Sequence, residues 1–481
     1  MIGFDAIIVG AGLAGLTAAY RLGCLAPHLG LALVERGRRL GGKILTERPD
    51  GFVVEGGADS FLSRKPAGLA LCEELGLTGR LHGRDPRHAA TFVKFQGALH
   101  PLPEGFSGLA PANLEALAES DLLSPAGRAR LAQEPEQPPW PAQSDESLAA
   151  FFSRRLGREA FERLVEPLLA GIYAGDASQL SLLATFPHLR QLELEHGSLL
   201  AGLAAGREAG SGPAGQVVAW PPFLSLPGGM GELVAALLEK LEQVTILAGC
   251  PATAMQPRPT GYEMALADGR RVAARAIILA TPAYVTARLL VGLDETLAAA
   301  HAAIPYASTA LVTLAFVAAD LPGPLDGYGY VIPQIEGSQA LACTWSSSKW
   351  PGRAPAGHAL LRLYLGRHGR PDVTACPDAE LLALARAELR QPLEVTAAPV
   401  RHWIHRWPQA MPQYTLGHLD RLAQIEASLK RWSGLFLAGA AYHGVGLPDC
   451  IHAGEMAAAG AHEYLLGLPK VRSDSFSPSA N

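Results

Sequence analysis

A glycine-rich turn near the amino terminus could hold a phosphate group. It consists of Gly10, Ala11, Gly12, Leu13, Ala14 and Gly15. Gly10 permits a tight turn, Gly12 lets the backbone approach a pyrophosphate, and Gly15 lets a helix pack closely on a strand. The free N–H groups and the dipole of the following helix then favour an anion. This spacing predicts a dinucleotide-binding loop; the alternative is a turn that binds no ligand.

The elements around this turn fit that prediction. Asp5–Val9 is a short apolar run typical of a buried parallel strand, Gly15–Leu25 has helical apolar spacing, and Leu31–Val34 is the next strand. Together they predict a βαβ unit of about 30 residues. Glu35 follows the second strand, where an acidic side chain can accept hydrogen bonds from a ribose.

Two further glycine pairs indicate which dinucleotide is bound. One pair stands in the run Leu40–Lys43 and the other in the run Glu55–Ser60. A nicotinamide enzyme needs no second glycine pair here. The longer FAD molecule extends past the first βαβ unit and needs close backbone approach along its length. The pattern therefore favours FAD; the alternative is that Gly41-Gly42 only forms a turn.

A third glycine-rich segment lies near the carboxyl terminus. The strand Gly434–Leu437 leads into the loop Gly444–Leu447 and then into a helix over about Asp449–Leu465. The N–H groups at the start of that helix could stabilise the negative charge that builds at the N1/O2 end of a flavin on reduction. We expect this loop and the first turn to share one flavin; the alternative is an ordinary strand–helix corner.

The middle of the chain has a different pattern. Residues 113–203 are mostly helical in pattern, and Ser144-Asp145-Glu146 is expected to open one helix after the loop-like run Glu134–Pro141. Arg207–Pro222 is typical of a loop. The elements expected after it are strands at Val244–Leu247, Tyr262–Leu266, Ala276–Ala280, Leu311–Phe316, Gly329–Ile332 and Leu360–Leu365, and a helix at Pro377–Arg390.

Composition and patterning exclude several classes of protein. The net charge of −5 gives no basic stripe for nucleic acid, and the six cysteines show no C-x-x-C pair or zinc spacing. Asp5 and the lack of a basic amino-terminal region argue against a signal peptide. Thr296–Ala319, the longest uncharged run, is expected to be a loop leading into a buried strand rather than a membrane helix. We therefore expect a cytoplasmic protein without a metal.

Together the motifs resemble those of the oxygen-dependent protoporphyrinogen/coproporphyrinogen oxidases. The blocks Asp5–Leu22, Glu35–Lys43 and Glu55–Leu62 fit any amine-oxidase-like flavoprotein. Ala440 supports the narrower resemblance, because many members of the wider superfamily have an acidic residue at this place, whereas the porphyrinogen oxidases resemble this sequence there. The resemblance covers residues 1 to about 467. Its more specific motifs are Gly171–Asp176 (G-I-Y-A-G-D), Met411–His418 (M-P-Q-Y-T-L-G-H) and Gly439–Ile451 (G-A-A-Y-H-G-V-G-L-P-D-C-I).

The resemblance implies an α/β fold with three parts. These are a Rossmann-like FAD-binding domain of the p-cresol methylhydroxylase (GR2) type, a mixed-sheet substrate-binding domain, and a helical membrane-facing domain. The FAD-binding domain is expected to be discontinuous, over residues 1–80, 225–295 and 405–467. The other expected bounds are 81–112 and 296–404 for the substrate-binding domain, 113–224 for the helical domain, and 468–481 for a disordered tail.

The resemblance also implies which residues meet FAD. Flavin N5 carries the chemistry, so no side chain is expected to act as a catalytic acid, base or nucleophile. Trp407 could instead be a core tryptophan. The expected contacts beyond the first turn are Glu35, Arg36, Gly42, Lys43, Gly57, Ala58, Asp59, Ser60, Ala252, Trp407, Val445, Gly446 and Leu447.

The implied reaction, in haem biosynthesis, removes six hydrogens from a porphyrinogen to give the porphyrin. Oxygen reoxidises the flavin, and hydrogen peroxide forms. A flat tetrapyrrole needs apolar and aromatic walls. The residues expected to supply them are Gly171, Tyr173, Tyr328, Val331 and Tyr364, each of which could instead be ordinary core.

The propionate groups of such a substrate need cations at the cavity mouth. Mitochondrial and plant relatives carry an arginine shortly before the strand that here is Phe92–Phe95, and Thr91 stands in that place. Lys94 or Arg64 could compensate, although either could be an ordinary surface charge. Protoporphyrinogen IX and coproporphyrinogen III both remain candidate substrates.

The expected partners are the porphyrinogen and molecular oxygen. Peripheral attachment to the inner face of the cell membrane, a ferrochelatase-type partner, and a monomer or homodimer are left open by the sequence. An amine oxidase or carotenoid desaturase of the same fold is one alternative activity. A binding protein without redox chemistry, like the prenyl-protein escort proteins, is another. Those proteins lose the glycine turn or the acidic ribose partner, and both are present here.

Overall fold

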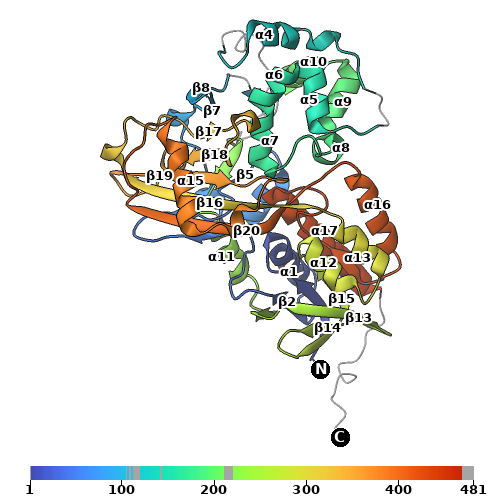
Figure 1. Cartoon of the computed structure of the whole chain (residues 1–481). Helices are drawn as coiled ribbons and strands as arrows, with labels where there is room; N and C mark the ends of the chain where they lie inside the picture. Colours follow the sequence, from blue (N-terminus) through green and yellow to red (C-terminus); the bar gives the residue numbers. More distant parts are fainter. Residues whose placement is uncertain are drawn as a thin grey trace.

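Figure 1 shows a computed structural model of the chain, with two large sheets and a group of helices as three neighbouring parts. The structure describes residues 2–103, 106–107, 110–111, 120–140, 144–210 and 220–467. The expected tail 468–481 lies outside the described residues. So does most of the expected loop Arg207–Pro222, of which residues 207–210 belong to a helix.

The first sheet is mainly parallel. Its strand order is β12-β2-β1-β15-β14-β13, and β21 also pairs with β15. The strands β12, β2, β1, β15 and β21 run parallel, whereas β14 and β13 are antiparallel additions. Parallel strands covered on both faces become continuous apolar runs, as β1 and β15 do. The strands are β1 (Ile2–Val9), β2 (Leu31–Glu35), β12 (Val244–Ala248), β13 (Ala252–Arg258), β14 (Gly261–Leu266), β15 (Arg271–Leu279) and β21 (Leu435–Leu437).

Helices cover both faces of this sheet. One face shares an apolar core with α1 (Leu13–Leu25), α11 (Gly231–Glu239) and α17 (Leu447–Leu466). The other shares a core with α12 (Ala283–Leu290), α13 (Glu295–Ala302) and α16 (His418–Leu429). The helix α2 (Pro66–Glu74) adds to the first core.

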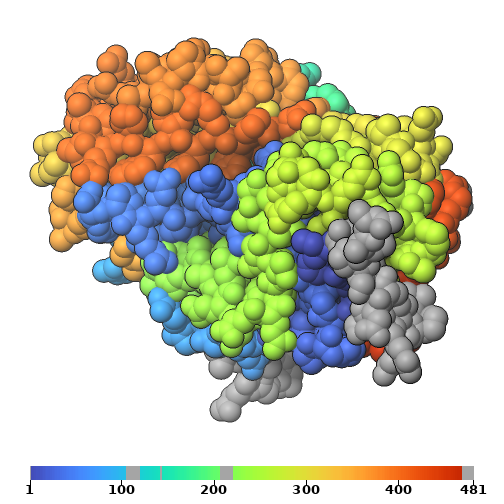
Figure 2. Space-filling view, turned by 90° about the horizontal axis from the view of Figure 1, so that it is seen from below, coloured from blue at the N-terminus to red at the C-terminus, as the bar shows by residue number. Residues whose placement is uncertain are grey.

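The first and last helices of the sheet lie directly against each other. A Cβ on Gly454 of α17 would overlap the carbonyl oxygen of Ala14 on α1, so the two backbones meet without an intervening side chain. Figure 2 shows the blue amino-terminal segment beside yellow-green residues from the middle of the chain on one face of the molecule. Both ends of the described chain therefore contribute to one body.

The second sheet is mixed, with the order β20-β16-β19-β18-β17-β7-β8. Only β17 and β7 pair in parallel, and α15 (Asp378–Arg390) covers one face. All of β20 pairs with this sheet, so the domain boundary expected at residue 405 falls inside a strand that its ladder hydrogen bonds keep whole. The strands are β7 (Phe92–Phe95), β8 (Ala98–Pro101), β16 (Tyr306–Val317), β17 (Gly329–Val331), β18 (Ala340–Trp345), β19 (His358–Leu365) and β20 (Arg401–Pro412).

Short elements connect the two large sheets. The strands β5, β11 and β6 form a small antiparallel sheet in that order, and β3 pairs with β4. The bounds are β3 (Thr46–Glu47), β4 (Val54–Glu55), β5 (Phe61–Leu62), β6 (His82–Gly83), β9 (Phe106–Ser107), β10 (Ala110–Pro111), β11 (Phe223–Ser225) and the single turn α14 (Ser346–Lys349).

The helical part has its own apolar core and a buried ionic cluster. Arg155 is fully buried, and its guanidinium donates to Glu134 and lies 3.5 Å from Glu193. Glu134 also accepts the backbone N–H of Leu199, so it holds the start of a helix. The helices are α4 (Pro125–Ala132), α5 (Leu148–Leu156), α6 (Arg158–Ala160), the π-helical turn η4 (Phe161–Val165), α7 (Glu166–Tyr173), α8 (Leu182–Thr185), α9 (Pro187–His196) and α10 (Leu199–Gly210).

Two local expectations, one for a helix start and one for a loop, are wrong. Ser144-Asp145-Glu146 does not open a helix, because the hydroxyl of Ser147 caps α5 by accepting the N–H of Ala150 at 3.2 Å. The first part of Thr296–Ala319 is not a loop but belongs to α13, which Asp294 caps from just outside that run. The buried strand expected in the rest of the run is confirmed as β16. Within the described residues, no helix combines the length and apolar character needed to cross a membrane.

The contact between α1 and α17 predicts opposite outcomes for one substitution at two sites. Gly454→Ala should destabilise the protein by about 1–3 kcal/mol, because the new Cβ meets backbone that cannot move aside. Gly460→Ala, in the same helix, has as its nearest neighbour the ring of Phe436 at 3.0 Å, which can rotate. It should be neutral or stabilise by up to about 1 kcal/mol through helix propensity. Denaturant unfolding measures the free energy of unfolding of both variants. An equal loss of stability in the two variants would contradict the packing argument.

Candidate functional site

The glycine motifs lie at the carboxyl ends of the parallel strands in the first sheet. The first turn follows β1, Glu35 ends β2, and β21 leads toward the start of α17. In parallel sheets this edge is where ligands bind. Gly10 has a φ of +102°, and a Cβ there would stand 2.8 Å from the carbonyl oxygen of Ala280 after β15. A Cβ on Gly15 would overlap the carbonyl oxygen of Gly10. Both glycines are therefore required by the turn itself.

Gly12 differs from these two glycines because it faces open space. The nearest atom to a Cβ there would be the Cα of Gly42, at 3.9 Å, and its φ of −74° suits any residue. Its role is therefore not explained by packing. The side chains of Ala11, Leu13 and Ala14 are buried, so the turn offers only backbone to a ligand. This backbone cradle at the amino end of α1 fits a pyrophosphate.

Glu35 holds the first glycine turn in place through a hydrogen bond to its backbone. Its two carboxylate oxygens accept the backbone N–H groups of Ala11 and Gly37, each at 2.8 Å. Each oxygen keeps a further lone pair, so the carboxylate can still accept ribose hydroxyls. The neighbouring Arg36 is exposed, and its placement adds no support for cofactor contact.

The second glycine pair packs onto the first turn. The N–H of Gly41 donates to the carbonyl of Ala11 at 2.8 Å, and Gly12 and Gly41 form a parallel bridge. Gly42 has a φ of +58°, and a Cβ there would stand 2.7 Å from the Cα of Gly12. The pair is more than a local turn, because it completes one wall of the cradle.

Lys43 joins this wall to the second sheet. Its ammonium donates to the carbonyl oxygen of Ala410 on β20. The thiol of Cys450, in the first turn of α17, lies near enough to act on Lys43 electrostatically. Lys43 therefore lies between the amino ends of the cofactor-side helices and the second sheet.

The stretch Gly57–Ser60 also faces the second sheet. The Asp59 carboxylate accepts the ammonium of Lys349 at 3.0 Å and the indole N–H of Trp350 at 3.1 Å. Although burial alone would raise it, the charges of Lys349 and Arg362 hold the pKa of Asp59 well below its usual range. The side chain of Asp59 is thus fully engaged by the protein.

The rest of that stretch offers mainly backbone and a hydroxyl. A Cβ on Gly57 would overlap the carbonyl oxygen of Lys43, so Gly57 is needed for packing. The hydroxyl of Ser60 donates to Asp59 at 2.8 Å, while Ala58 is partly exposed. A cofactor here would therefore meet Ala58 and the main chain rather than the Asp59 carboxylate.

Two further residues predicted to contact the cofactor, Ala252 and Trp407, lie far along the chain from the first glycine turn. Ala252 begins β13 two residues after Cys250, whose N–H donates to the carbonyl of Glu35 at 2.9 Å, so it lies near the expected ribose site. Trp407, on β20, donates its indole N–H to the carbonyl of Gly56 at 2.6 Å. That bond makes Trp407 a link between the sheets.

The third glycine segment forms the start of α17. Gly446 caps the helix, Leu447 begins it, and Val445 packs against the core of the helical part. The Asp449 carboxylate accepts the N–H of Gly446 at 3.1 Å and the ammonium of Lys65 at 2.6 and 2.7 Å. The negative charge of Asp449 is favourable at the amino end of α17, and Lys65 compensates that charge.

A tyrosine that the sequence analysis did not single out holds this segment. The Tyr414 hydroxyl donates to the carbonyl of Ala440 at 2.7 Å and accepts the N–H of Gly444 at 2.8 Å. Its ring stacks on His418, with centroids 4.2 Å apart. Burial lowers the pKa of His418 to about 4. The motif Met411–His418 carried the signal for both residues, but only the fold shows what they touch.

The predicted substrate residues divide into two groups. Tyr173 ends α7, is buried, and its ring lies 6.4 Å from that of Tyr414 beside the third segment. Gly171, two residues earlier, has no atom within 4 Å of where a Cβ would stand. Tyr364 packs against the core formed by the end of α7, and Val331 against that of the helical part. These four are gathered around α7.

Tyr328 lies in a different place. Its hydroxyl donates to the carbonyl of Asp85 at 3.0 Å, and its ring lines a cavity of about 840 Å³. Of the five predicted substrate residues, Tyr328 alone lines this cavity.

The expected substitutes for a substrate-binding arginine are not supported. Lys94 is buried in an ion pair with Glu388, 2.5 Å away, so it is wrong as a free cation; burial made that pairing necessary. Arg64 is exposed and makes no ion pair among the residues that the structure describes. Thr91 lies at the start of β7, where its carbonyl accepts the N–H of Leu102.

Comparison with known proteins gives the same assignment along nearly the whole chain. The sequence model of the family described as flavin containing amine oxidoreductase matches residues 13–462. Coproporphyrinogen III oxidase of Bacillus subtilis (strain 168) is 34% identical over 465 residues, which covers 95% of this chain and 98% of the relative. The chloroplastic protoporphyrinogen oxidase of Nicotiana tabacum is 32% identical over 473 residues, 93% of this chain and 83% of the relative.

A solved structure agrees with these relatives. A crystal structure from Exiguobacterium sp. 255-15, whose name refers to protoporphyrinogen oxidase, superposes with a TM-score of 0.85. It is 32% identical and covers 95% of this chain and 98% of its own.

The glycine geometry predicts that two similar substitutions fail for different reasons. Gly12→Ala should leave the unfolding free energy of the apoprotein within about 1 kcal/mol, because its Cβ enters open space, yet should sharply reduce bound FAD. Gly15→Ala should destabilise the apoprotein by about 1–3 kcal/mol through backbone overlap. Flavin absorbance of the purified proteins and denaturant unfolding measure the two effects. Full FAD content in Gly12→Ala would show that the cradle holds no pyrophosphate.

His418 predicts a specific dependence of stability on pH. The folded protein keeps His418 neutral down to about pH 4, whereas the unfolded chain takes up its proton near pH 6.5. Stability relative to His418→Phe should therefore fall as pH drops from about 6.5 to about 4, by at most about 3 kcal/mol. The difference in unfolding free energy between the two proteins, measured across this range, tests the effect. His402→Phe, at an exposed position on β20, is the matched control; a flat difference at His418 would refute the prediction.

Proposed function

Because the chain belongs to the flavin-containing amine oxidoreductase family, we propose that it is an FAD-dependent enzyme that oxidises a porphyrinogen to a porphyrin in haem biosynthesis. Molecular oxygen is the electron acceptor, and hydrogen peroxide is the second product. The match to named relatives carries the proposal. Two of them, a coproporphyrinogen III oxidase and a protoporphyrinogen oxidase, align over 95% and 93% of this chain.

The residues of the carboxyl edge suit FAD along its length. The Gly12 backbone and the start of α1 would hold the diphosphate, and Glu35 would hold the ribose of the adenosine. Bound FAD would accept hydride from a methylene bridge of the substrate at N5. The first turn of α17 would favour the negative charge that follows, because Lys65 already neutralises Asp449.

The two sheets have separate tasks in this proposal. The first sheet and its helices bind the cofactor. The second sheet and α7 cover the reacting face, where Tyr173, Tyr364 and Val331 supply apolar and aromatic surface. Lys43 and Asp59 join the two parts, so they position the substrate side over the cofactor side.

Membrane contact and delivery of the product to a ferrochelatase-type partner belong to the same proposal. Large apolar side chains are exposed on the helical part and near it, among them Ile172, Leu194 and Leu416, which are 41–44% exposed. Such side chains suit attachment to the surface of the membrane, because each places apolar area at an interface.

Alternative activities of the fold make different predictions. A binding protein without redox chemistry has no need of an intact phosphate cradle, so the space at Gly12 and the hydrogen bond from Ala11 to Glu35 favour a cofactor-binding enzyme. An amine oxidase would produce hydrogen peroxide from primary amines.

An aerobic assay of the purified FAD-loaded protein tests the proposal. Porphyrin fluorescence and hydrogen peroxide should both appear with coproporphyrinogen III or with protoporphyrinogen IX, and the faster reaction identifies the substrate. Without oxygen, the absorbance of the flavin near 450 nm, about the usual wavelength for flavins, should bleach on mixing. Gly12→Ala, which should lack FAD, is the control for spontaneous oxidation. Peroxide from amines without porphyrin from either porphyrinogen would favour the amine oxidase instead.

A further inference from the structure

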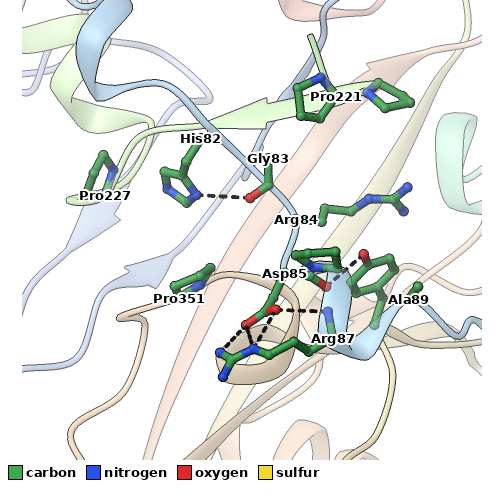
Figure 3. A pocket seen from close by; sticks show the side chains of 12 residues that line it. His82, Gly83, Arg84, Asp85, Arg87, Ala89, Pro221, Pro227 and Pro351 are labelled. Carbon is green, nitrogen blue, oxygen red and sulfur yellow. Dashed lines mark hydrogen bonds and ion pairs between the residues drawn. The ribbon is translucent and has the colours of Figure 1, made fainter. Parts of the chain in front are cut away.

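A cavity of about 840 Å³ lies where β6, the loop after it and β11 face the second sheet. Figure 3 shows its lining, which includes His82, Arg84, Arg87, Pro221 and Pro351. Its volume falls in the range of pockets that hold cofactor-sized ligands. Among the residues predicted from sequence, only Tyr328 lines it.

Arg84 is a cation in this cavity without an acidic partner among the described residues. Its guanidinium carbon lies 4.4 Å from the ring centre of Tyr328 and 4.8 Å from that of Phe223. The structure shows no hydrogen bond or ion pair to Arg84 from any residue that it describes. Two aromatic rings hold the planar group in place and leave its N–H edge for an outside acceptor. Burial also lowers the pKa of Arg84, as expected for a cation that lacks a counterion.

The other charged groups at this cavity cancel one another. The Asp85 carboxylate accepts the guanidinium of Arg87 at 2.6 and 3.0 Å and also accepts its backbone N–H at 3.0 Å. Figure 3 shows Arg84 directed away from this pair. Asp59, which acts on Arg84 electrostatically, is already paired with Lys349. An anion that enters the cavity therefore meets one uncompensated positive charge.

The side chain of Trp350 lies between the cavity and Gly57–Ser60, the segment expected to contact the cofactor. The ring of Trp350 lies edge-on to His82, with centroids 5.8 Å apart, and its indole N–H donates to Asp59. Trp350 thus separates the cavity wall from Gly57–Ser60. A ligand anchored at Arg84 would therefore lie on the other side of Trp350 from the residues expected to contact the cofactor.

We propose that Arg84 binds a carboxylate of the substrate and fixes its orientation. That the carboxylate is a propionate of a porphyrinogen rests on the function proposed above. The geometry suits this task because an arginine fork takes a carboxylate with two parallel hydrogen bonds. Arg84, in the loop after β6, would then supply the cation for the carboxylate. Lys94 cannot supply it, because it is paired with Glu388.

Steady-state kinetics of the FAD-loaded Arg84→Met protein test the inference. Loss of a charge-assisted hydrogen bond to a carboxylate should raise KM for coproporphyrinogen III by about ten- to a hundredfold. The kcat should stay within about twofold, because binding rather than chemistry is affected. Arg84→Lys keeps the charge but loses the fork, and should give an intermediate KM. The tetramethyl ester of the same substrate, presented in detergent, should show no difference between the variant and the unmodified protein.

Arg80→Met is the matched control. Arg80 lies four positions earlier, is mostly exposed, and pairs with Glu232. It should leave KM unchanged. The inference is overturned if Arg84→Met leaves KM unchanged, or if KM rises equally for the ester, since Arg84 would then only shape the cavity.

A binding measurement separates failure of this inference from failure of the proposed function. Coproporphyrin III, the oxidised product, carries the same carboxylates and needs no turnover. Quenching of its fluorescence by the FAD-loaded protein should weaken by about tenfold or more in Arg84→Met and not in Arg80→Met. If the unmodified protein binds the porphyrin through Arg84 but oxidises no porphyrinogen, the proposed function fails and the carboxylate site stands. If affinity is equal in all three proteins, the site fails.

Discussion

The structure depends on backbone approaching backbone at places where no side chain fits. Gly454 brings α17 onto the Ala14 carbonyl of α1, and Gly10 brings the first turn against Ala280 after β15. Gly42 brings the second glycine pair onto Gly12. These contacts join segments from the two ends and the middle of the chain. They set the width of the space in which a dinucleotide can lie, because a single methyl group at most of them would push the walls apart.

Gly12 is the exception among the glycines of the first turn. The other glycines are explained by their neighbours, but Gly12 faces open space on the ligand side. No contact among the residues that the structure describes requires a glycine at position 12, so a bound ligand is the remaining physical reason for one there. Glu35 supports the same conclusion, because it fixes the turn through backbone N–H groups and still has acceptor capacity to spare.

Charge decides how the second sheet sits over the first. Asp59 forms ion pairs with Lys349 and Arg362 of the second part. Lys43 donates a hydrogen bond to the main chain of β20. Buried charges must be paired, so these links fix the relative position of the two parts. The same rule makes Arg84 unusual. Fully buried arginines such as Arg155 have carboxylate partners, whereas the partly buried Arg84 contacts two aromatic rings and pairs with no carboxylate among the described residues.

The sequence by itself determined the cofactor half of this protein. Local patterns were enough there, because the βαβ unit, the glycine turn and Glu35 lie within a short stretch whose spacing is set by strand and helix geometry. The strand and helix near the carboxyl terminus were also predicted close to their observed bounds, β21 and α17. The starts of α5 and α13 were missed, since a single capping side chain, Ser147 or Asp294, decides each.

Only the tertiary structure decided which polar groups are free. Asp59 and Lys94 have the right chemistry for a ligand, but partners distant in sequence, Lys349 and Glu388, already hold them. Arg84 gave no signal in the sequence, because only the fold shows that Asp85 pairs with Arg87, and Asp59 with Lys349, rather than with Arg84. Whether a charge is compensated depends on residues that folding brings together from far along the chain, and no local pattern records that.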